Sequence, residues 1–575
     1  MSGGSGADPV KIRRTHPRHP AGRTTRMDRA PARSTAPRRT MERMRTSPAL
    51  RAAALAATAT VLLPLAGCSD GDDSGGEGST PTGASTASPT ATSKELASQK
   101  LDWSPCPAPN VAQGGGESPT PLPGGAVWEC SFMDVPLDYA EPDGRTIELA
   151  LIRGKAKDQK RRIGSLLFNF GGPGASGVAT LPAFGADYDK LRTRYDLVSF
   201  DPRGVGRSEG VECADDAQLD ALYQEDSTPD DAAEEKEFVQ GQKDFIATCK
   251  KNSGPELPYV GTTNAARDMD LMRSVLGDDK LHYFGISYGT ELGGVYAHLF
   301  PDKVGRAVFD AVVDPTKDAE QSSLGQAQGF QLAFDNFTKD CADRGDTCAL
   351  PGATGAEVEE WIADFLAKLE KEPVDGLGDR VLTQTLATTG IASALYSKET
   401  WPLLEQGLDE ADGGEGALLL ALADSLNGRS DDGRYDNSNA ANIAINCADS
   451  EQRFSLEQTK AALPAFRKAS PTFGEYLGWG LMSCTGWPVA GAWVTPDVSA
   501  PGSAPILVIG NTGDPATPYA GAKAMVEKLG KGVGVELTYK GEGHGAYNSK
   551  NTCVQGAVDG YLLNGTVPKS GTVCE

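Results

Sequence analysis

One stretch of the chain, residues 281–300, restricts the fold more than any other. It runs from the apolar residues Leu281 to Phe284 into Gly285-Ile286-Ser287-Tyr288-Gly289, and a helical pattern follows. Glycines on both sides of a serine allow a tight, strained turn from a strand into a helix, and such a turn exposes the serine hydroxyl at the helix N-terminus. We therefore predict that Ser287 is a nucleophile at the carboxyl end of a strand.

The rest of the chain beyond residue 101 alternates short apolar runs with helical patterns, which is typical of a mostly parallel sheet flanked by helices. Ligands bind such sheets at the carboxyl ends of the strands. The candidate strands are 128–135, 147–152, 165–170, 197–200, 281–284, 307–313, 506–509 and 535–539.

Between residues 314 and 445 the alternation stops and amphipathic helical patterns take over, for example at 329–342, 358–371 and 417–426. We expect an α/β core in two parts, 101–315 and 446–575, with an inserted helical cap at 316–445. A cap at the carboxyl ends of strands can form a lid that controls access to the nucleophile.

A serine hydroxyl becomes a good nucleophile only when a base takes its proton, so a histidine is required. The chain has five histidines. His16 and His19 lie in the basic N-terminal region, while His282 falls within the strand before the serine and His298 within the helix after it. We predict that His544 is the base, because it lies in a glycine-rich loop, 541–545, directly after the last candidate strand.

The base needs a carboxylate that fixes its tautomer and stabilises the imidazolium. Asp514 follows the apolar strand 506–509 and precedes Pro515, so it could also be a helix N-cap. Asp314, after the strand 307–313, is the rival acid. We favour Asp514, because the order Ser287, Asp514, His544 is the nucleophile, acid, histidine order of the α/β-hydrolase fold.

An acyl transfer also needs N–H donors for the developing oxyanion. The glycine run 171–174 follows the strand 165–170, and we assign the backbone amides of Gly172 and Tyr288 to this role. A phosphate-binding loop is the competing interpretation of the run, but no Gly-Lys-Ser/Thr follows it. No metal or cofactor is expected, because the histidines outside the N-terminal region lack ligand spacing.

The N-terminal part has the features of an export signal. Residues 1–40 are basic and rich in proline, and they are either unstructured or upstream of the true start. Residues 41–67 combine arginines with the apolar run 52–66, which predicts a signal peptide, since about 15 apolar residues are too few to span a bilayer. Leu65-Ala66-Gly67-Cys68 resembles a lipobox, so Cys68 is the expected lipidation site. Plain secretion is the alternative.

Residues 68–100 are mostly Ser, Thr, Gly, Pro, Ala and Asp up to residue 93, and we expect a flexible stalk. The formal net charge is −23, although residues 1–51 hold 13 Lys and Arg against three Asp and Glu. The rest of the chain is therefore strongly acidic. Such a surface repels phosphates, so nucleic acid is not an expected partner.

The eleven cysteines contain no CxxC pair, and their number indicates an oxidising compartment. Without Cys68 ten remain, which fall into sequence neighbours. Buried free thiols are the alternative, and connectivity does not follow from sequence. The expected disulfides are Cys106–Cys130, Cys213–Cys249, Cys341–Cys348, Cys447–Cys484 and Cys553–Cys574.

Four motifs together resemble the bacterial tripeptidyl aminopeptidases, exported relatives of the prolyl aminopeptidases within the α/β-hydrolases. They occur in the family's order from about residue 100 to the C-terminus. They are Gly171-Gly172-Pro173-Gly174-Ala175-Ser176-Gly177, Asp201-Pro202-Arg203-Gly204-Val205-Gly206-Arg207-Ser208, Gly285 to Thr290, and Gly513-Asp514-Pro515-Ala516-Thr517-Pro518 with Gly543-His544-Gly545.

The resemblance implies the release of short peptides, typically tripeptides, from free N-termini of extracellular polypeptides through an acyl-enzyme. Such an exopeptidase must recognise a protonated α-amine, which calls for an acidic anchor. Asp449, where the chain returns from the cap, is the candidate, and a surface aspartate beside a disulfide is the alternative interpretation. We expect a monomer that contacts the membrane only through its lipid anchor.

Two other functions compete with this hypothesis. One is a cell-surface carboxylesterase whose cap forms an apolar acyl pocket without an amine anchor. The other is a solute-binding lipoprotein with two α/β lobes. A binding lobe has no need of serine, aspartate and histidine at three successive loop ends, which argues against the second.

Overall fold

The computed structural model describes residues 93–575 and contains a sheet of ten strands in the order β1-β2-β3-β5-β4-β6-β7-β10-β11-β12. The first three strands pair antiparallel and β3 pairs antiparallel with β5, whereas the pairs from β5 to β12 are parallel. The strands are β1 Ser104–Pro105, β2 Glu129–Pro136, β3 Thr146–Gly154, β4 Gly164–Asn169, β5 Tyr195–Phe200, β6 Leu281–Ile286, β7 Val304–Asp310, β10 Ile506–Gly513, β11 Gly534–Glu542 and β12 Thr572–Cys574.

Both faces of the sheet are buried, as near-continuous apolar strands require. In β10, Ile506 and Val508 pack into one hydrophobic cluster, while Leu507 and Ile509 pack into another on the opposite face. The first cluster includes side chains of α7 (Thr262–Val275), α8 (Tyr288–Leu299) and α17 (Ala520–Leu529), and the second includes those of α4 (Gly177–Ala183) and α18 (Thr552–Asn564). The α/β-hydrolase type of architecture expected from the sequence is therefore present.

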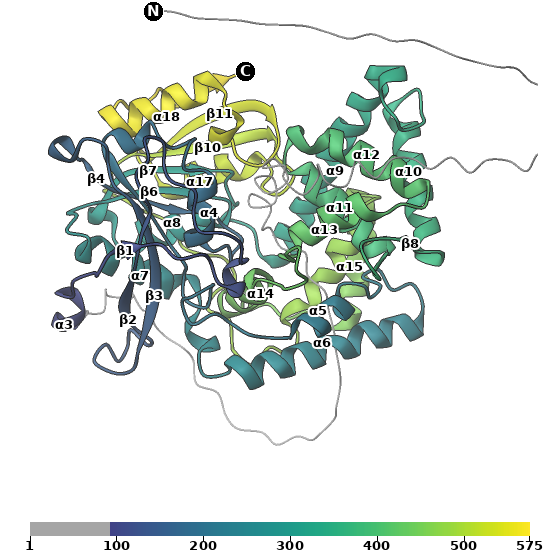
Figure 1. Cartoon of the computed structure of the whole chain (residues 1–575), viewed down its shortest axis with the longest axis horizontal. Helices are drawn as coiled ribbons and strands as arrows, with labels where there is room; N and C mark the ends of the chain where they lie inside the picture. The colour runs from purple at the N-terminus through teal and green to yellow at the C-terminus, as the bar shows by residue number, and fades with distance from the viewer. Residues whose placement is uncertain (1–92) are drawn as a thin grey trace, which may run out of the picture. The chain divides into compact units, whose positions relative to one another are not determined.

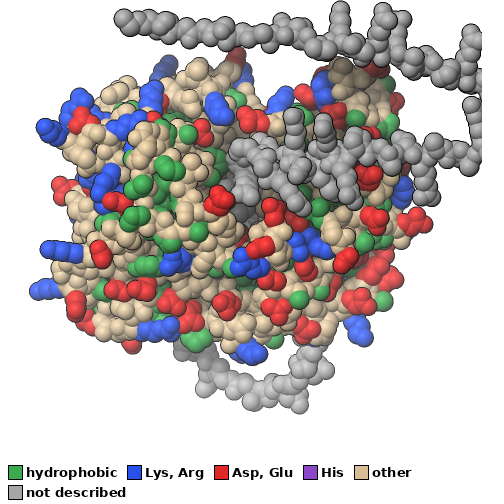
Figure 2. Space-filling model, viewed as in Figure 1, with side chains coloured by type: hydrophobic (Ala, Val, Ile, Leu, Met, Phe, Trp, Pro, Cys, Tyr) green, Lys and Arg blue, Asp and Glu red, His purple; other side chains and the backbone are tan. Residues whose placement is uncertain are grey.

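The helices that follow β7 form the cap, which has its own hydrophobic core (Figure 1). They are α9 (Ala319–Arg344), α10 (Gly355–Lys371), α11 (Gln384–Leu395), α12 (Trp401–Asp412) and α13 (Ala417–Leu426), with a small hairpin of β8 (Val374–Asp375) and β9 (Val381–Leu382). Figure 2 shows many acidic side chains over the cap side of this face, in keeping with the negative net charge.

The helical cap continues past residue 445, where the sequence prediction ended it. Helices α15 (Leu456–Ala469) and α16 (Gly474–Trp479) pack on α9, and Phe466, Phe473 and Tyr476 belong to the cap core. Between these two groups of helices, α14 (Ser438–Asp449) packs against the α/β core instead, since Ala441, Ala444 and Ile445 belong to the core's cluster.

The remaining helices lie before β6 or at the start of the described chain. Helix α5 (Asp216–Leu222) and the long helix α6 (Ala232–Ser253) run along the cap and α14 (Figure 1). Residues 94–97, which the sequence prediction placed in the stalk, form the short helix α3 (Lys94–Ala97), and Leu96 packs into the core. The ordered domain therefore begins earlier than expected.

Five disulfides join the ten cysteines of the described residues, with the pairings expected from sequence neighbours. Such a number of disulfides is typical of an extracytoplasmic protein. Within residues 93–575, no helix is long and apolar enough to cross a membrane. The predicted signal peptide 41–67, Cys68, and the stalk up to residue 92 lie outside the described residues.

Candidate active site

Ser287 lies in the turn between β6 and α8, as the N-cap residue of the helix. Its backbone has φ 58° and ψ −129°, a conformation that is strained for a residue with a side chain. The side chain is buried, with 6% of the residue exposed. The backbone N–H of Ser287 donates to the carbonyl of Asp310 at the end of β7 (3.1 Å), which fixes the turn against the neighbouring strand.

Glycine is required on both sides of Ser287 because the backbone is crowded there. A Cβ at Gly285 would lie 2.3 Å from the carbonyl oxygen of Gly289, and a Cβ at Gly289 would lie 2.6 Å from the carbonyl oxygen of Asn169. The Gly-x-Ser-x-Gly pattern thus follows from packing in the strand-to-helix turn.

His544 and Asp514 form a buried pair at the carboxyl ends of β11 and β10. The Nδ1 atom of His544 lies 2.8 Å from Oδ1 and 3.1 Å from Oδ2 of Asp514. Asp514 Oδ1 also accepts the backbone N–H groups of Ala516 and Thr517 (3.0 and 2.9 Å), so the carboxylate is held in place. Asp514 therefore both orients the imidazole and caps the turn after β10.

The other ring nitrogen of His544, Nε2, is buried and has no hydrogen-bond partner among residues 93–575. This is the atom that must take the proton of a serine nucleophile. The structure thus contains no hydrogen bond between His544 and Ser287. Catalytic hydrogen bonds of ligand-free enzymes are often long and tighten only in the substrate complex.

The cap contacts the histidine loop directly. The backbone N–H of His544 donates to the carbonyl of Tyr396, just after α11 (2.8 Å), and the Tyr396 ring stands edge-on to the imidazole with 5.3 Å between centroids. Helix α9 also packs on the loop after β10, since a Cβ at Gly329 would lie 2.4 Å from the carbonyl oxygen of Pro515. This part of the cap is therefore a wall of the site, and sequence reasoning found neither contact.

The two backbone groups expected to bind the oxyanion lie on adjoining segments. A Cβ at Gly171 would lie 2.7 Å from Cβ of Ser287 and 3.2 Å from the backbone N of Tyr288, so the glycine loop rests on the nucleophile turn. The N–H of Gly171 donates to Asn169 Oδ1 (3.0 Å). Tyr288 is the first residue of α8, where an N–H has no acceptor within the helix and the helix dipole favours negative charge.

Asp449, the candidate amine anchor, is buried at the end of α14 rather than exposed. Its two carboxylate oxygens accept the backbone N–H (2.9 Å) and the hydroxyl of Thr262. The Thr262 hydroxyl also bonds to the hydroxyl of Tyr288. Burial raises the pKa of Asp449 to about 7, and burial beside Asp449 raises the pKa of Glu291 to about 8. Asp449 thus caps α7 and supports the residue next to Ser287.

The rival acid, Asp314, does not contact the histidine in the structure. Its Oδ1 accepts the N–H and hydroxyl of Thr316. His282 and His298 also make other contacts, since His282 Nδ1 accepts the N–H of Arg306 and His298 Nδ1 lies 2.8 Å from the carbonyl of Ser499. Burial lowers the pKa of His282 to about 4, so this side chain is neutral.

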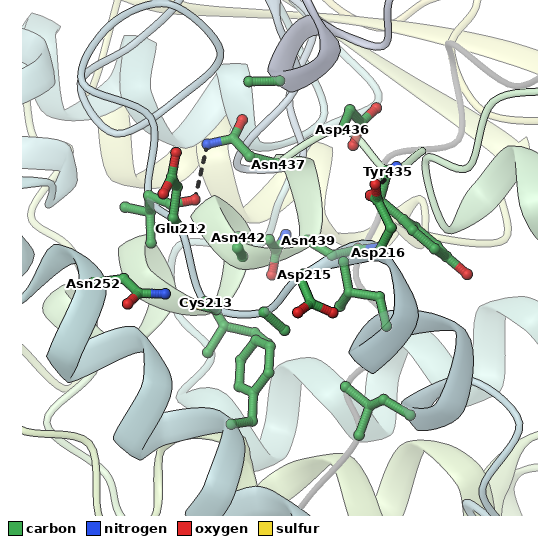
Figure 3. A pocket seen from close by; sticks show the side chains of 18 of the residues that line it. Glu212, Cys213, Asp215, Asp216, Asn252, Tyr435, Asp436, Asn437, Asn439 and Asn442 are labelled. Carbon is green, nitrogen blue, oxygen red and sulfur yellow. Dashed lines mark hydrogen bonds between the residues drawn. The ribbon is translucent and has the colours of Figure 1, made fainter. Parts of the chain in front are cut away.

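A separate cavity of about 320 Å³ lies between α14, α5 and α6 (Figure 3). None of the described residues that line it is Lys, Arg or His. Its wall includes Asn442, whose side-chain amide donates to the carbonyl of Pro173 (2.9 Å), next to Gly172. Its polar lining residues are Glu212, Asp215, Asp216, Tyr223, Asn252, Tyr435, Asp436, Asn437, Asn439 and Asn442.

Comparison with known proteins agrees with this fold. Residues 164–348 match the model of the alpha/beta hydrolase fold, and residues 470–574 match the TAP-like protein family. The serine protease Hip1 of Mycobacterium tuberculosis is 38% identical over 488 residues, which cover 83% of this chain and 91% of the relative.

Two further relatives have different names. The tripeptidyl aminopeptidase of Streptomyces coelicolor is 31% identical over 485 residues, 82% of this chain and 86% of the relative. Carboxylesterase B of M. tuberculosis is 37% identical over 459 residues, 77% of this chain and 86% of the relative. The chain is therefore a serine hydrolase of the α/β-hydrolase fold and belongs to the family of tripeptidyl aminopeptidase-like proteins.

Proposed function

We propose that the protein is an extracytoplasmic exopeptidase that releases short peptides, tripeptides in particular, from free N-termini through an acyl-enzyme on Ser287. The observation that carries the proposal is the buried pair of Asp514 and His544. Nε2 of His544 has no hydrogen-bond partner among residues 93–575. The loop that carries His544 is joined to the nucleophile turn through Asp310. Relatives named as a serine protease and as a tripeptidyl aminopeptidase support a peptide substrate.

The reaction would proceed in two halves. His544 takes the proton of Ser287 Oγ while the oxygen attacks the scissile carbonyl, and the N–H groups of Gly172 and Tyr288 stabilise the oxyanion. His544 then protonates the leaving amine of the shortened polypeptide. A water molecule, activated by the same histidine, hydrolyses the acyl-enzyme and releases the short peptide.

The second candidate function is that of a carboxylesterase, favoured by the relative that bears this name. Fluorophosphonate labelling of the wild type and of Ser287→Ala tests the nucleophile, and the variant should take no label. Hydrolysis of a tripeptide anilide with a free N-terminus, of its N-acetylated form and of a simple acyl ester then separates the two functions. Preference for the N-acetylated peptide or the ester would refute the exopeptidase.

Recognition of the α-amine by Asp449 remains part of the proposal. An ammonium ion beside the buried carboxylate would favour its charged form. Asp449→Asn should lower kcat/KM for the tripeptide anilide with a free N-terminus and leave kcat/KM for the ester unchanged. Thr262→Val is the matched control, because it removes the hydroxyl bound to Asp449 and keeps the carboxylate. An equal loss on both substrates would show instead that Asp449 acts through Thr262 and Tyr288 on the nucleophile turn.

We also propose that a lipid on Cys68 anchors the enzyme to the outer face of the cell membrane and that the enzyme is a monomer. The sequence Leu65-Ala66-Gly67-Cys68 supports the anchor. Cells that express the wild type should incorporate labelled palmitate into the protein and retain it in the membrane fraction. Release of both the wild type and Cys68→Ala into the medium to the same extent would refute the anchor.

A further inference from the structure

Asp310, the last residue of β7, carries a buried carboxylate, since 1% of the residue is exposed. Burial raises its pKa, and hydrogen bonds from the backbone N–H groups of Tyr547 and Ala546 oppose this effect. A buried carboxylate without a paired cation is costly unless its oxygens are well supplied with donors. The packing of β7 alone therefore does not account for an aspartate at this position.

The side chain of Asp310 holds the histidine loop. Oδ1 and Oδ2 accept the N–H of Ala546 (2.9 and 3.0 Å), and Oδ2 also accepts the N–H of Tyr547 (2.9 Å). These residues follow His544 by two and three positions. Ala546 is the N-cap residue of the short helix 547–549 and makes no side-chain cap of its own. Asp310 thus supplies the cap from another strand.

The backbone of the same residue holds the nucleophile turn. The carbonyl oxygen of Asp310 accepts the N–H of Ser287 (3.1 Å), and Asp310 is paired with Ile286 on one side and with Ile509 of β10 on the other. One residue therefore lies between the strand that carries the serine and the strand that leads to Asp514. It is bonded to the serine through its backbone and to the histidine loop through its side chain.

The other contacts of His544 hold its ring and the near side of its loop. Asp514 binds Nδ1 of the ring, and Tyr396 binds the backbone N–H from the cap. Gly545, with φ +91°, then separates the histidine from Ala546. A glycine adopts this conformation without strain. Beyond it the segment is held by the bonds of Asp310 and by the buried Tyr547, whose hydroxyl donates to Asp559.

We propose that Asp310 is a positioning residue for the acyl transfer, which sets the distance between His544 and Ser287 by binding both segments. The inference rests on the proposed function of the Ser287 site but not on the choice of peptide or ester. Asp310 touches no reacting atom.

Asp310→Asn is the sharpest test, because asparagine has the same shape and offers one acceptor in place of two. The N–H of Ala546 contacts both oxygens and that of Tyr547 contacts Oδ2, so an NH₂ group in either place faces at least one of these donors and weakens the hold on the loop. We expect kcat to fall by about 10- to 100-fold with KM within about threefold of the wild type, since misplacement by about 1 Å is enough for such a loss. The rate of fluorophosphonate labelling should fall by a similar factor.

Asp268→Asn is the matched control. Asp268 is a fully buried carboxylate that accepts hydrogen bonds from Arg203 and Tyr139 and none from Ser287 or the histidine loop, so its replacement should lower the unfolding temperature without lowering kcat of the folded protein. If Asp310→Asn does not fold, Asp310→Ser, which removes the carboxylate and shortens the side chain by one bond, takes its place with the same expectation.

The inference is overturned if folded Asp310→Asn, or Asp310→Ser, keeps kcat and labelling rate within twofold of the wild type. It is also overturned if Asp268→Asn loses as much kcat at equal stability, because the effect would then be general. Failure of the proposed function gives a different result, namely a wild type that takes no fluorophosphonate or a Ser287→Ala variant that keeps its activity.

Discussion

Replacing Gly171 by alanine tests how closely the glycine loop, residues 171–174, packs against the nucleophile turn. Gly171 has φ +92°, and its added Cβ would lie 2.7 Å from both the carbonyl oxygen of Ile286 and Cβ of Ser287. The positive φ alone costs about 1–2 kcal/mol. The overlap of the added Cβ with the nucleophile turn adds about 1–3 kcal/mol, as overpacking of a close-packed site does. We expect a loss of about 2–5 kcal/mol in the free energy of unfolding.

Gly277→Ala is the control for the conformational part of this loss. Gly277 has φ +78° after the end of α7, and its added Cβ would meet no atom within 4 Å. It should therefore lose only about 1–2 kcal/mol and keep wild-type kcat. Urea unfolding and hydrolysis of the tripeptide anilide measure both quantities. Equal stability losses, or an unchanged kcat in Gly171→Ala, would refute the close approach of the two segments.

Three further predictions concern other parts of the site and the cap. Tyr396→Ala should lower kcat more than it raises KM, because the edge-on ring supports the imidazole; an unchanged kcat of the folded variant would contradict this. Serines in place of Cys447 and Cys484 should lower the free energy of unfolding by about 2–5 kcal/mol, and equal urea midpoints would argue against the bond. The third concerns Asp449, whose pKa of about 7 in the folded state exceeds its unfolded value near 4. The folded state thus binds the extra proton, and stability should fall by up to about 4 kcal/mol as pH rises from about 4 to about 7. Asp449→Asn should lack this contribution in unfolding experiments across that range; an identical pH dependence would exclude it.

Eight of the ten strands of the sheet could be predicted from sequence because each contains an apolar run, and the nucleophile turn because its glycines have a local cause. Asp310 was missed, since the predicted strand 307–313 ran through it. The only indication in the sequence was an acidic residue inside an apolar run. A buried carboxylate implies a hydrogen-bond partner, but the sequence does not identify that partner.

Contacts between distant segments also lay beyond local patterns. The carbonyl of Tyr396 accepts the N–H of His544 because α11 ends next to the histidine loop. A helical sequence pattern does not say which distant segment the end of the helix contacts. The extent of the cap was misjudged for the same reason. Helices α15 and α16 follow α14, which packs on the core, yet they return to α9 in the cap.

The placement of β10 beside β7 bears on when the enzyme becomes active. The strand that leads to Asp514 pairs with a strand that ended almost 200 residues earlier, and the cap is formed by the chain between them. Pairing of two strands so far apart in the sequence is slow, because the entropy cost of closing the long intervening loop precedes the stabilising contacts. His544 follows later still and is fixed by Tyr396 and Asp310 only after both core parts have met. A chain that folds from its N-terminal part would form the serine turn long before it had a working base. The hydrolase would therefore remain inert until the loop that carries His544 has joined the core.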